Sequence, residues 1–190
     1  MHMIWKLLWL FLIYSFAGWV LETVLASLKQ KKFANRGIIN GPFCLIYGFG
    51  GFFITAFTRE LTGIWLFLGC AIVASLLEWI AGHLIEMWYH ERWWDYRKIM
   101  WNLDGYVSVP TSCVWGILGV FVIKIGNGLC MSLYGMLPGL ISRIIILVLL
   151  GVLAVDAIAT LTILFGHSKN PERWIAADRD IDSVTKKLGA

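Results

Sequence analysis

Charged residues are scarce in this chain. Only 15% of its 190 residues are Asp, Glu, Lys or Arg, whereas an ordinary soluble domain carries about 25%. Hydrophobic residues make up 59%, and the mean hydropathy is +0.74. This balance excludes an ordinary soluble domain and favours a single unit whose main partner is the lipid bilayer. The net charge of +4 is too small to indicate a nucleic-acid partner.

Cysteine is rare too, and the familiar catalytic patterns are missing. No two cysteines form a CxxC pair, and three of them lie in apolar runs: Cys44, Cys70, Cys113 and Cys130. We interpret them as small buried residues rather than as a zinc or disulfide framework. The chain has no Walker A, GxSxG, HExxH or dinucleotide-binding glycine pattern. The sequence therefore predicts no cofactor and no metal, and it leaves enzymatic activity open.

Long apolar runs dominate what is present. They predict an all-α fold, a polytopic bundle of about five transmembrane helices, at residues 4–28, 43–58, 62–88, 107–125 and 140–165. The second run is near the lower length limit for crossing a bilayer, so we expect it to be tilted or partly re-entrant. Glycine-rich residues 126–139 are expected to form a connection or a short interfacial piece. The bundle would span 1–166, followed by a polar tail over 167–190.

Basic residues fall mainly into three segments, 29–36, 92–98 and 169–187. Five helices place all three segments on one side, and cytoplasmic segments carry an excess of Lys and Arg. We therefore expect a multi-pass protein of the cell membrane with its N-terminus outside and its tail in the cytoplasm. Arg59, Lys124 and Arg143 lie on the opposite side, so the bias is not absolute.

Acidic side chains inside the apolar runs are the main functional signal, because each costs about 2.5–3.5 kcal/mol at a helix centre. They are Glu22, Glu78, Glu86 and Asp156. Helical spacing places Glu78, Gly82 and Glu86 on one stripe. The three glutamates fall in the cytoplasmic half, so we expect a polar cavity that opens to the cytoplasm. Structural ion pairs and simple interfacial anchoring are the alternatives for these acids.

The segment from Tyr89 to Tyr106 combines adjacent tryptophans with acids and arginines. An interfacial aromatic belt accounts for it without any site. A lid over the cavity is the functional alternative. Aromatic faces beside carboxylates suit an organic cation, whereas Arg36 and Arg92 equally suit a phosphate or a lipid headgroup.

Six motifs occur in a fixed order: GWVLE (18–22), NRGIINGPFCLIYGFGG (35–51), LLEWIAGHLIE (76–86), RWWDY (92–96), NLDGY (102–106) and VWG (114–116). In these motifs the chain resembles the bacterial type IV ABC-transporter permease family, also called CmpB-like, to which the animal TMEM229 proteins are similar. The resemblance covers residues 4–126. It implies that fifteen residues belong to the family pattern: Glu22, Asn35, Arg36, Gly37, Pro42, Tyr47, Gly48, Glu78, Glu86, Trp94, Asp95, Tyr96, Asn102, Gly105 and Trp115. Tyr106 departs from the basic residue that is common after the NxxG glycine.

The resemblance implies a transport component whose ATPase would be a separate subunit, and which would need a partner or a second copy to form a pathway. Glu78 and Glu86 would bind a cation or proton, Glu22 would complete an acidic wall, and Arg36 would balance it or hold an anionic group. The candidate cavity residues are Glu22, Asn35, Arg36, Tyr47, Glu78, Glu86, Arg92, Trp94, Asp95, Tyr96, Asn102 and Trp115. The alternatives are a small membrane enzyme that uses the same carboxylates on a lipid or amphiphile, and a structural or regulatory subunit.

Overall fold

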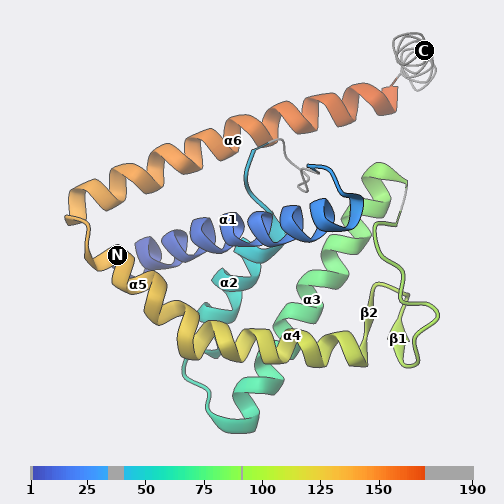
Figure 1. Ribbon diagram of the computed structural model, residues 1–190, viewed down its shortest axis with the longest axis horizontal. Coiled ribbons are helices and arrows are strands. Elements are labelled where there is room, and N and C mark those ends of the chain that lie inside the picture. Colours follow the sequence, from blue (N-terminus) through green and yellow to red (C-terminus); the bar gives the residue numbers. More distant parts are fainter. Residues whose placement is uncertain (1, 34–40, 91, 170–190) are drawn as a thin grey trace.

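Helices form almost all of the computed structural model, which describes residues 2–33, 41–90 and 92–169 (Figure 1). Four helical segments in this part of the chain are long and apolar enough to cross a membrane. They are α1 (His2–Gln30), α3 (Gly63–Tyr89), the continuous run of α4 (Val109–Phe121), η1 (Val122–Gly126) and α5 (Asn127–Gly135), and α6 (Gly139–Lys169). With the shorter apolar helix α2 (Leu45–Thr58), they confirm the predicted all-α membrane bundle.

Helix α2 covers only part of the bilayer thickness. Its 14 residues extend about 21 Å at 1.5 Å per residue, whereas the hydrocarbon core is about 30 Å thick. It begins beside the middle of α1, where the Cys44 amide donates to the Ser15 carbonyl at 2.8 Å. It ends near the start of α1, where Arg59 contacts the Met3 sulfur at 3.1 Å. The helix is therefore shorter than the predicted 43–58, and the chain enters it through non-helical backbone at membrane depth.

The contact between α1 and α2 depends on small residues. Gly48 lies so close to α1 that an added Cβ would overlap the Ser15 hydroxyl and lie 2.7 Å from the Phe11 carbonyl oxygen. Gly51 lies equally close to the Tyr14 ring. The glycines of α2 thus allow close helix packing, and this contact fixes the depth at which α2 begins.

Residues 126–135 correct the sequence prediction. They do not form a connection but continue α4 through the π-turn η1 into α5. Asn127 is held from two sides, since its Nδ2 donates to the Thr55 hydroxyl at 3.0 Å and its Oδ1 accepts from the Tyr14 hydroxyl at 3.0 Å. A polar residue that would favour a loop in water is thus satisfied inside the bundle, and the helix continues.

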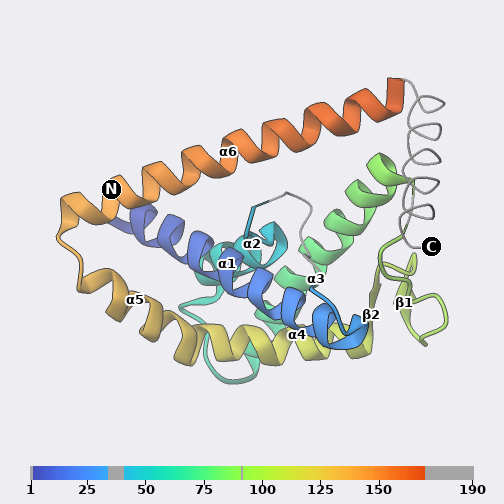
Figure 2. The same ribbon diagram turned by 45° about the horizontal axis from the view of Figure 1, so that its top comes forward.

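Helix α6 lies along the outside of the bundle and packs mainly against α1 (Figure 2). Ile146 and Leu153 of α6 join Trp9 and Leu12 of α1 in one buried cluster. The half-buried Asp156 carboxyl is held by backbone from another segment, because the Gly41 amide donates to its Oδ2 at 2.6 Å. This acid, which the sequence left without a partner, therefore anchors the segment that precedes α2.

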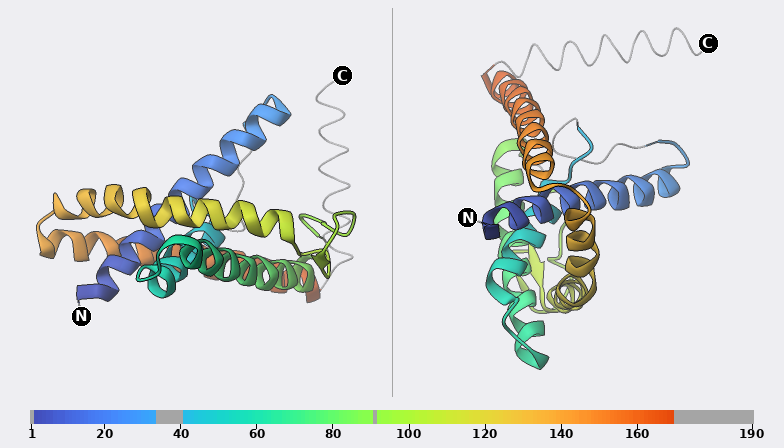
Figure 3. Two further views of the ribbon diagram at one scale, coloured as in Figure 1. Left: turned by 90° about the horizontal axis from the view of Figure 1, so that it is seen from below. Right: turned by 90° about the vertical axis from the view of Figure 1, so that its left-hand side faces the viewer.

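A short hairpin follows α3 and is formed by β1 (Asn102–Leu103) and β2 (Val107–Ser108), paired antiparallel. Gly105 takes the left-handed backbone conformation, with φ of +77°, that the turn requires. The C-terminal ends of α1, α3 and α6 lie at the same end of the bundle as this hairpin (Figures 1 and 3). The described basic residues that follow α1 and α3 therefore share one end, while the side of the membrane that this end faces stays a prediction.

Candidate functional site

A cavity of about 310 Å³ lies where α2 begins, and we call it the polar cavity. Helices α1, α2, α3 and α4 and the loop after α3 contribute to its wall. The lining residues are Glu22 of α1, Cys44 to Tyr47 at the start of α2, Glu78, Ala81 and Ile85 of α3, Trp93, Trp94 and Tyr96 of the loop, and Trp115 of α4. The cavity thus unites six of the residues predicted from the sequence: Glu22, Tyr47, Glu78, Trp94, Tyr96 and Trp115.

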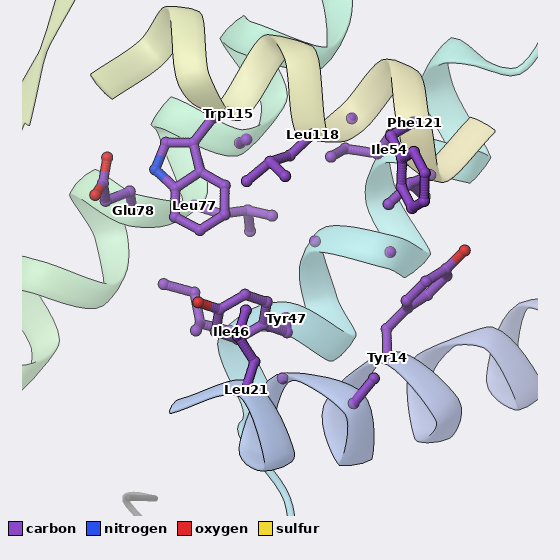
Figure 4. A pocket seen from close by; sticks show the side chains of 17 residues that line it. Tyr14, Leu21, Ile46, Tyr47, Ile54, Leu77, Glu78, Trp115, Leu118 and Phe121 are labelled. Atoms are coloured by element: carbon purple, nitrogen blue, oxygen red, sulfur yellow. The ribbon is translucent and has the colours of Figure 1, made fainter. Parts of the chain in front are cut away.

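Glu78 is the most unusual group in this wall. Its side chain is only 4% exposed. Its Oε1 accepts a hydrogen bond from the Tyr96 hydroxyl at 3.2 Å, and its Oε2 has no hydrogen-bond partner within the described residues. The indole nitrogen of Trp115 is turned toward the carboxyl group (Figure 4). Burying a carboxyl oxygen that has no hydrogen-bond partner costs free energy, unless a ligand takes the place of the missing partner.

Glu22 supplies a second carboxyl group from the opposite wall. Its Oε1 accepts from the Tyr47 hydroxyl at 2.8 Å. Tyr47 is the third residue of α2, so Glu22 lies near the N-terminal end of that helix, where the peptide dipoles favour negative charge. Two acids therefore face one cavity from α1 and α3.

Aromatic rings complete the wall between the acids. Tyr47 and Trp115 meet edge to face with centroids 5.9 Å apart. Trp94 is fixed by a hydrogen bond from its indole nitrogen to the Tyr106 carbonyl at 2.9 Å. Burial, and secondly the Glu78 carboxyl, raise the pKa of Tyr96 to about 12. The Tyr96 hydroxyl consequently stays protonated at neutral pH and remains a donor to Glu78.

Glu86 lies outside the polar cavity, although it shares a helical stripe with Glu78. Its carboxyl pairs with Arg92 at 2.7 Å and accepts a hydrogen bond from the Tyr106 hydroxyl. The Arg92 guanidinium also donates to the Asp104 carbonyl at 2.8 Å and lies over the Tyr106 ring at 4.4 Å. The hydrogen bond to Glu86 raises the pKa of Tyr106. This cluster ties the loop to the end of α3.

Asp95 and Asn102 shape the loop instead of lining the cavity. Asp95 pairs with Arg97 at 2.6 Å, and that guanidinium holds the pKa of Asp95 at about 2. The Asn102 side chain donates to the Ile99 carbonyl at 2.8 Å and accepts from the Gly105 amide at 3.1 Å. Asn35 and Arg36, the remaining candidates, lie outside the described residues.

Sequence reasoning missed Cys44 as a cavity residue and did not single out Trp93. Cys44 reaches the wall because it directly precedes the first turn of α2, and a hydropathy plot does not show which helix start lies at a cavity. Trp93 stood in the loop as one of several interfacial aromatics, and nothing in the sequence distinguished it. Among the described residues, no three His, Cys, Asp or Glu side chains are grouped as metal ligands.

A second cavity of about 200 Å³ adjoins the first, and we call it the apolar cavity. Its lining is hydrocarbon over most of its surface and includes Leu21, Ile46, Ile54, Ala74, Leu77 and Leu118. Figure 4 shows α1 and α4 on opposite sides of this space, with α2 and α3 between them. Four residues line both cavities: Ile46, Tyr47, Glu78 and Trp115.

Comparison with known proteins gives one match. Residues 9–161 match the family described as "Putative ABC-transporter type IV". No curated protein and no solved structure matches the chain.

Proposed function

Since the chain belongs to this type IV ABC-transporter family, we propose that it is a membrane transport component whose polar cavity binds a cation. The observation that carries the proposal is the Glu78 carboxyl, which is 4% exposed and keeps one oxygen without a partner within the described residues. A cation would complete its coordination, and Glu22 would add a second negative charge. Surrounding aromatic faces suit an organic cation better than a small hydrated metal ion.

The short helix α2 supports this proposal. Transporters commonly place their substrate near the bilayer midplane, beside helices that are interrupted there. Here α2 begins beside Ser15 in the middle of α1, and the polar cavity lies at this helix end. Irregular backbone at membrane depth is tolerated where the protein buries it or where it lines a cavity, and Phe43 is indeed buried.

We further propose that the polar cavity opens toward the cytoplasm, because it lies near the end that carries the basic segments. Glu86, which the sequence assigned to cation binding, would instead fix the loop through Arg92. An ATPase would be a separate subunit, or a second copy of the chain would complete the pathway.

The proposal is tested with purified full-length chain in nanodiscs and tetramethylammonium chloride as the probe. Isothermal titration, with sodium chloride matched for ionic strength, should show binding to the unchanged chain. Glu78→Gln keeps the shape of the side chain but removes its charge, so the affinity should fall roughly tenfold or more.

The matched control is Glu60→Gln. Glu60 is 83% exposed and pairs with Arg59 at the opposite end of the bundle, so its loss should leave tetramethylammonium binding unchanged. Circular dichroism and gel filtration would establish that both variants are folded. Equal binding by Glu78→Gln and the unchanged chain would reject the cation site.

A further inference from the structure

We infer that the ligand is an amphiphilic cation, a long-chain amine or quaternary ammonium compound, which enters from the bilayer between α1 and α4. Its headgroup would occupy the polar cavity and its alkyl chain the apolar cavity. The inference rests on the proposed function, because it assumes the cation site at Glu78, and it adds the chemistry of the rest of the molecule and its route of entry.

The apolar cavity opens to lipid on one side. Three of its lining residues stand at the surface of the bundle: Leu21 of α1 is 48% exposed, and Leu118 and Phe121 of α4 are 45% and 53% exposed. Within the described residues α1 and α4 pack only weakly against each other, whereas each packs closely on a neighbour, α2 or α3. The two helices therefore border an opening.

The opening lies near the middle of the membrane. Leu21 is nine residues before the end of α1, and Leu118 is nine residues after the start of α4. At 1.5 Å per residue, both lie about 14 Å from the hairpin end, which is close to half of a hydrocarbon core of about 30 Å. A molecule that enters here comes from the acyl-chain region, so it must carry a hydrocarbon part.

The size and lining of the apolar cavity suit a hydrocarbon chain. At about 200 Å³, it exceeds the roughly 150 Å³ that suffices for an apolar cavity to stay dry and bind benzene. The residues shared with the polar cavity place Glu78 and the Tyr47–Trp115 pair at the junction. A chain in one cavity thus continues directly to a charged head beside Glu78.

The charge of the head follows from the side chains that line the two cavities. Glu22 and Glu78 are acidic, and no Lys or Arg of the described residues lines either cavity. Arg92 and Arg97 of the nearby loop are already paired with Glu86 and Asp95. A positive head is therefore favoured over a phosphate or a carboxylate.

The test uses photolabelling of the full-length chain in dodecyl maltoside micelles. One probe is dodecyltrimethylammonium with a diazirine in its chain, and the other is a neutral dodecyl ether with the same diazirine. We expect the cationic probe to label apolar-cavity residues such as Leu21, Ile54 and Leu118, located by mass spectrometry, and the neutral probe to label them far less. Glu78→Gln should remove this difference.

Gly50→Leu separates the inference from the proposed function. Gly50 lines the apolar cavity, and a Cβ added there meets nothing within 4 Å, so a leucine fills the cavity without disturbing packing. Labelling by the long-chain cation should fall roughly tenfold, and much more than tetramethylammonium binding does. Gly151→Leu is the matched control, since Gly151 of α6 also has open space and lines neither cavity.

Three results would overturn the inference. The first is that Gly50→Leu leaves labelling by the long-chain cation unchanged, while Glu78→Gln still lowers the affinity for tetramethylammonium. This result would support the cation site but reject the apolar cavity as the place of the alkyl chain. The second is equal labelling by the neutral probe, which would indicate a simple hydrocarbon groove. The third is labelling that disappears in a dimeric fraction, which would assign the apolar cavity to a second copy of the chain.

Discussion

Two glutamates on one face of α3 have different surroundings. Glu86 is three residues from the end of α3, where Arg92 folds back to neutralise it. Glu78 is two turns deeper, where the Tyr96 hydroxyl donates to it and the Trp115 indole is turned toward it. Helical spacing predicts their shared stripe, but the spacing cannot show which acid the loop will satisfy. The difference arises because a loop cation reaches the last turn of a helix and not the third.

Arg92 is predicted to be the residue that holds the loop closed. Arg92→Ala removes contacts to Glu86, to the Asp104 carbonyl and to the Tyr106 ring. Backbone amides of residues 92–108 should then exchange with deuterium markedly faster, because local opening governs exchange. Lys98→Ala, at an exposed position of the same loop, serves as the control and should leave exchange unchanged. Identical exchange in both variants would contradict this role.

At the scale of the elements, the short helix α2 sets the architecture of the site. Its position depends on the absence of a side chain at Gly48, where α1 and α2 are in backbone contact. Because α2 begins at mid-membrane, the polar cavity can lie between α1, α3 and α4 at its N-terminal end. A full-length α2 would occupy that space.

Gly48→Ala is expected to destabilise the bundle, because the added methyl group overlaps Ser15 and approaches the Phe11 carbonyl. Overpacking of this kind costs about 1–3 kcal/mol, which should appear as a lower unfolding temperature in detergent. Gly50→Ala, two residues away, adds a methyl group with nothing within 4 Å and should leave the unfolding temperature unchanged or slightly raised. A similar fall in both variants would show that the contact of Gly48 with α1 is not the cause.

The elements could be predicted to different degrees. Helices α1, α3 and α6 were predicted to within about four residues at each end, because long apolar runs are bounded by charged or polar residues. The bounds of α2 were predicted equally closely, but the continuation through Asn127 was not, since it depends on the contacts of Asn127 with Tyr14 and Thr55. Within the site, Glu22 and Glu78 could be identified because acids are rare in apolar helices. Cys44 could not, because its position follows from tertiary packing alone.

At the scale of the whole molecule, the described basic segments at the ends of α1 and α3 share the hairpin end of the bundle. The opposite end carries the turn after α2, with Glu60 83% exposed. The positive-inside rule then predicts that the hairpin end faces the cytoplasm. Both ends offer exposed positions at which this orientation can be measured.

Cysteine labelling of intact cells checks the orientation. Glu60→Cys should react with a membrane-impermeant maleimide added outside, whereas Lys98→Cys should react only after the cells are broken. The gain is measured against the unsubstituted chain, whose Cys70 and Cys130 are buried. Labelling of Lys98→Cys in intact cells, with Glu60→Cys protected, would reverse the predicted topology.

The hydrogen bond from Tyr96 to Glu78 joins the loop to the wall of the polar cavity. It therefore couples two equilibria, the closing of the loop and the binding of a cation in the cavity. Because a cation at the free oxygen of Glu78 would share the carboxylate with the Tyr96 hydroxyl, cation binding would weaken this hydrogen bond, and the hydrogen bond would weaken cation binding by the same factor, as thermodynamic reciprocity demands. A bound cation would then release the loop at the hairpin end of the bundle. A partner protein that binds the loop would, in turn, change the affinity of the polar cavity for the cation. Cation binding at Glu78 and opening of the loop would thus be coupled through a single hydroxyl group, although Glu78 lies about 16 Å along α3 from the helix end.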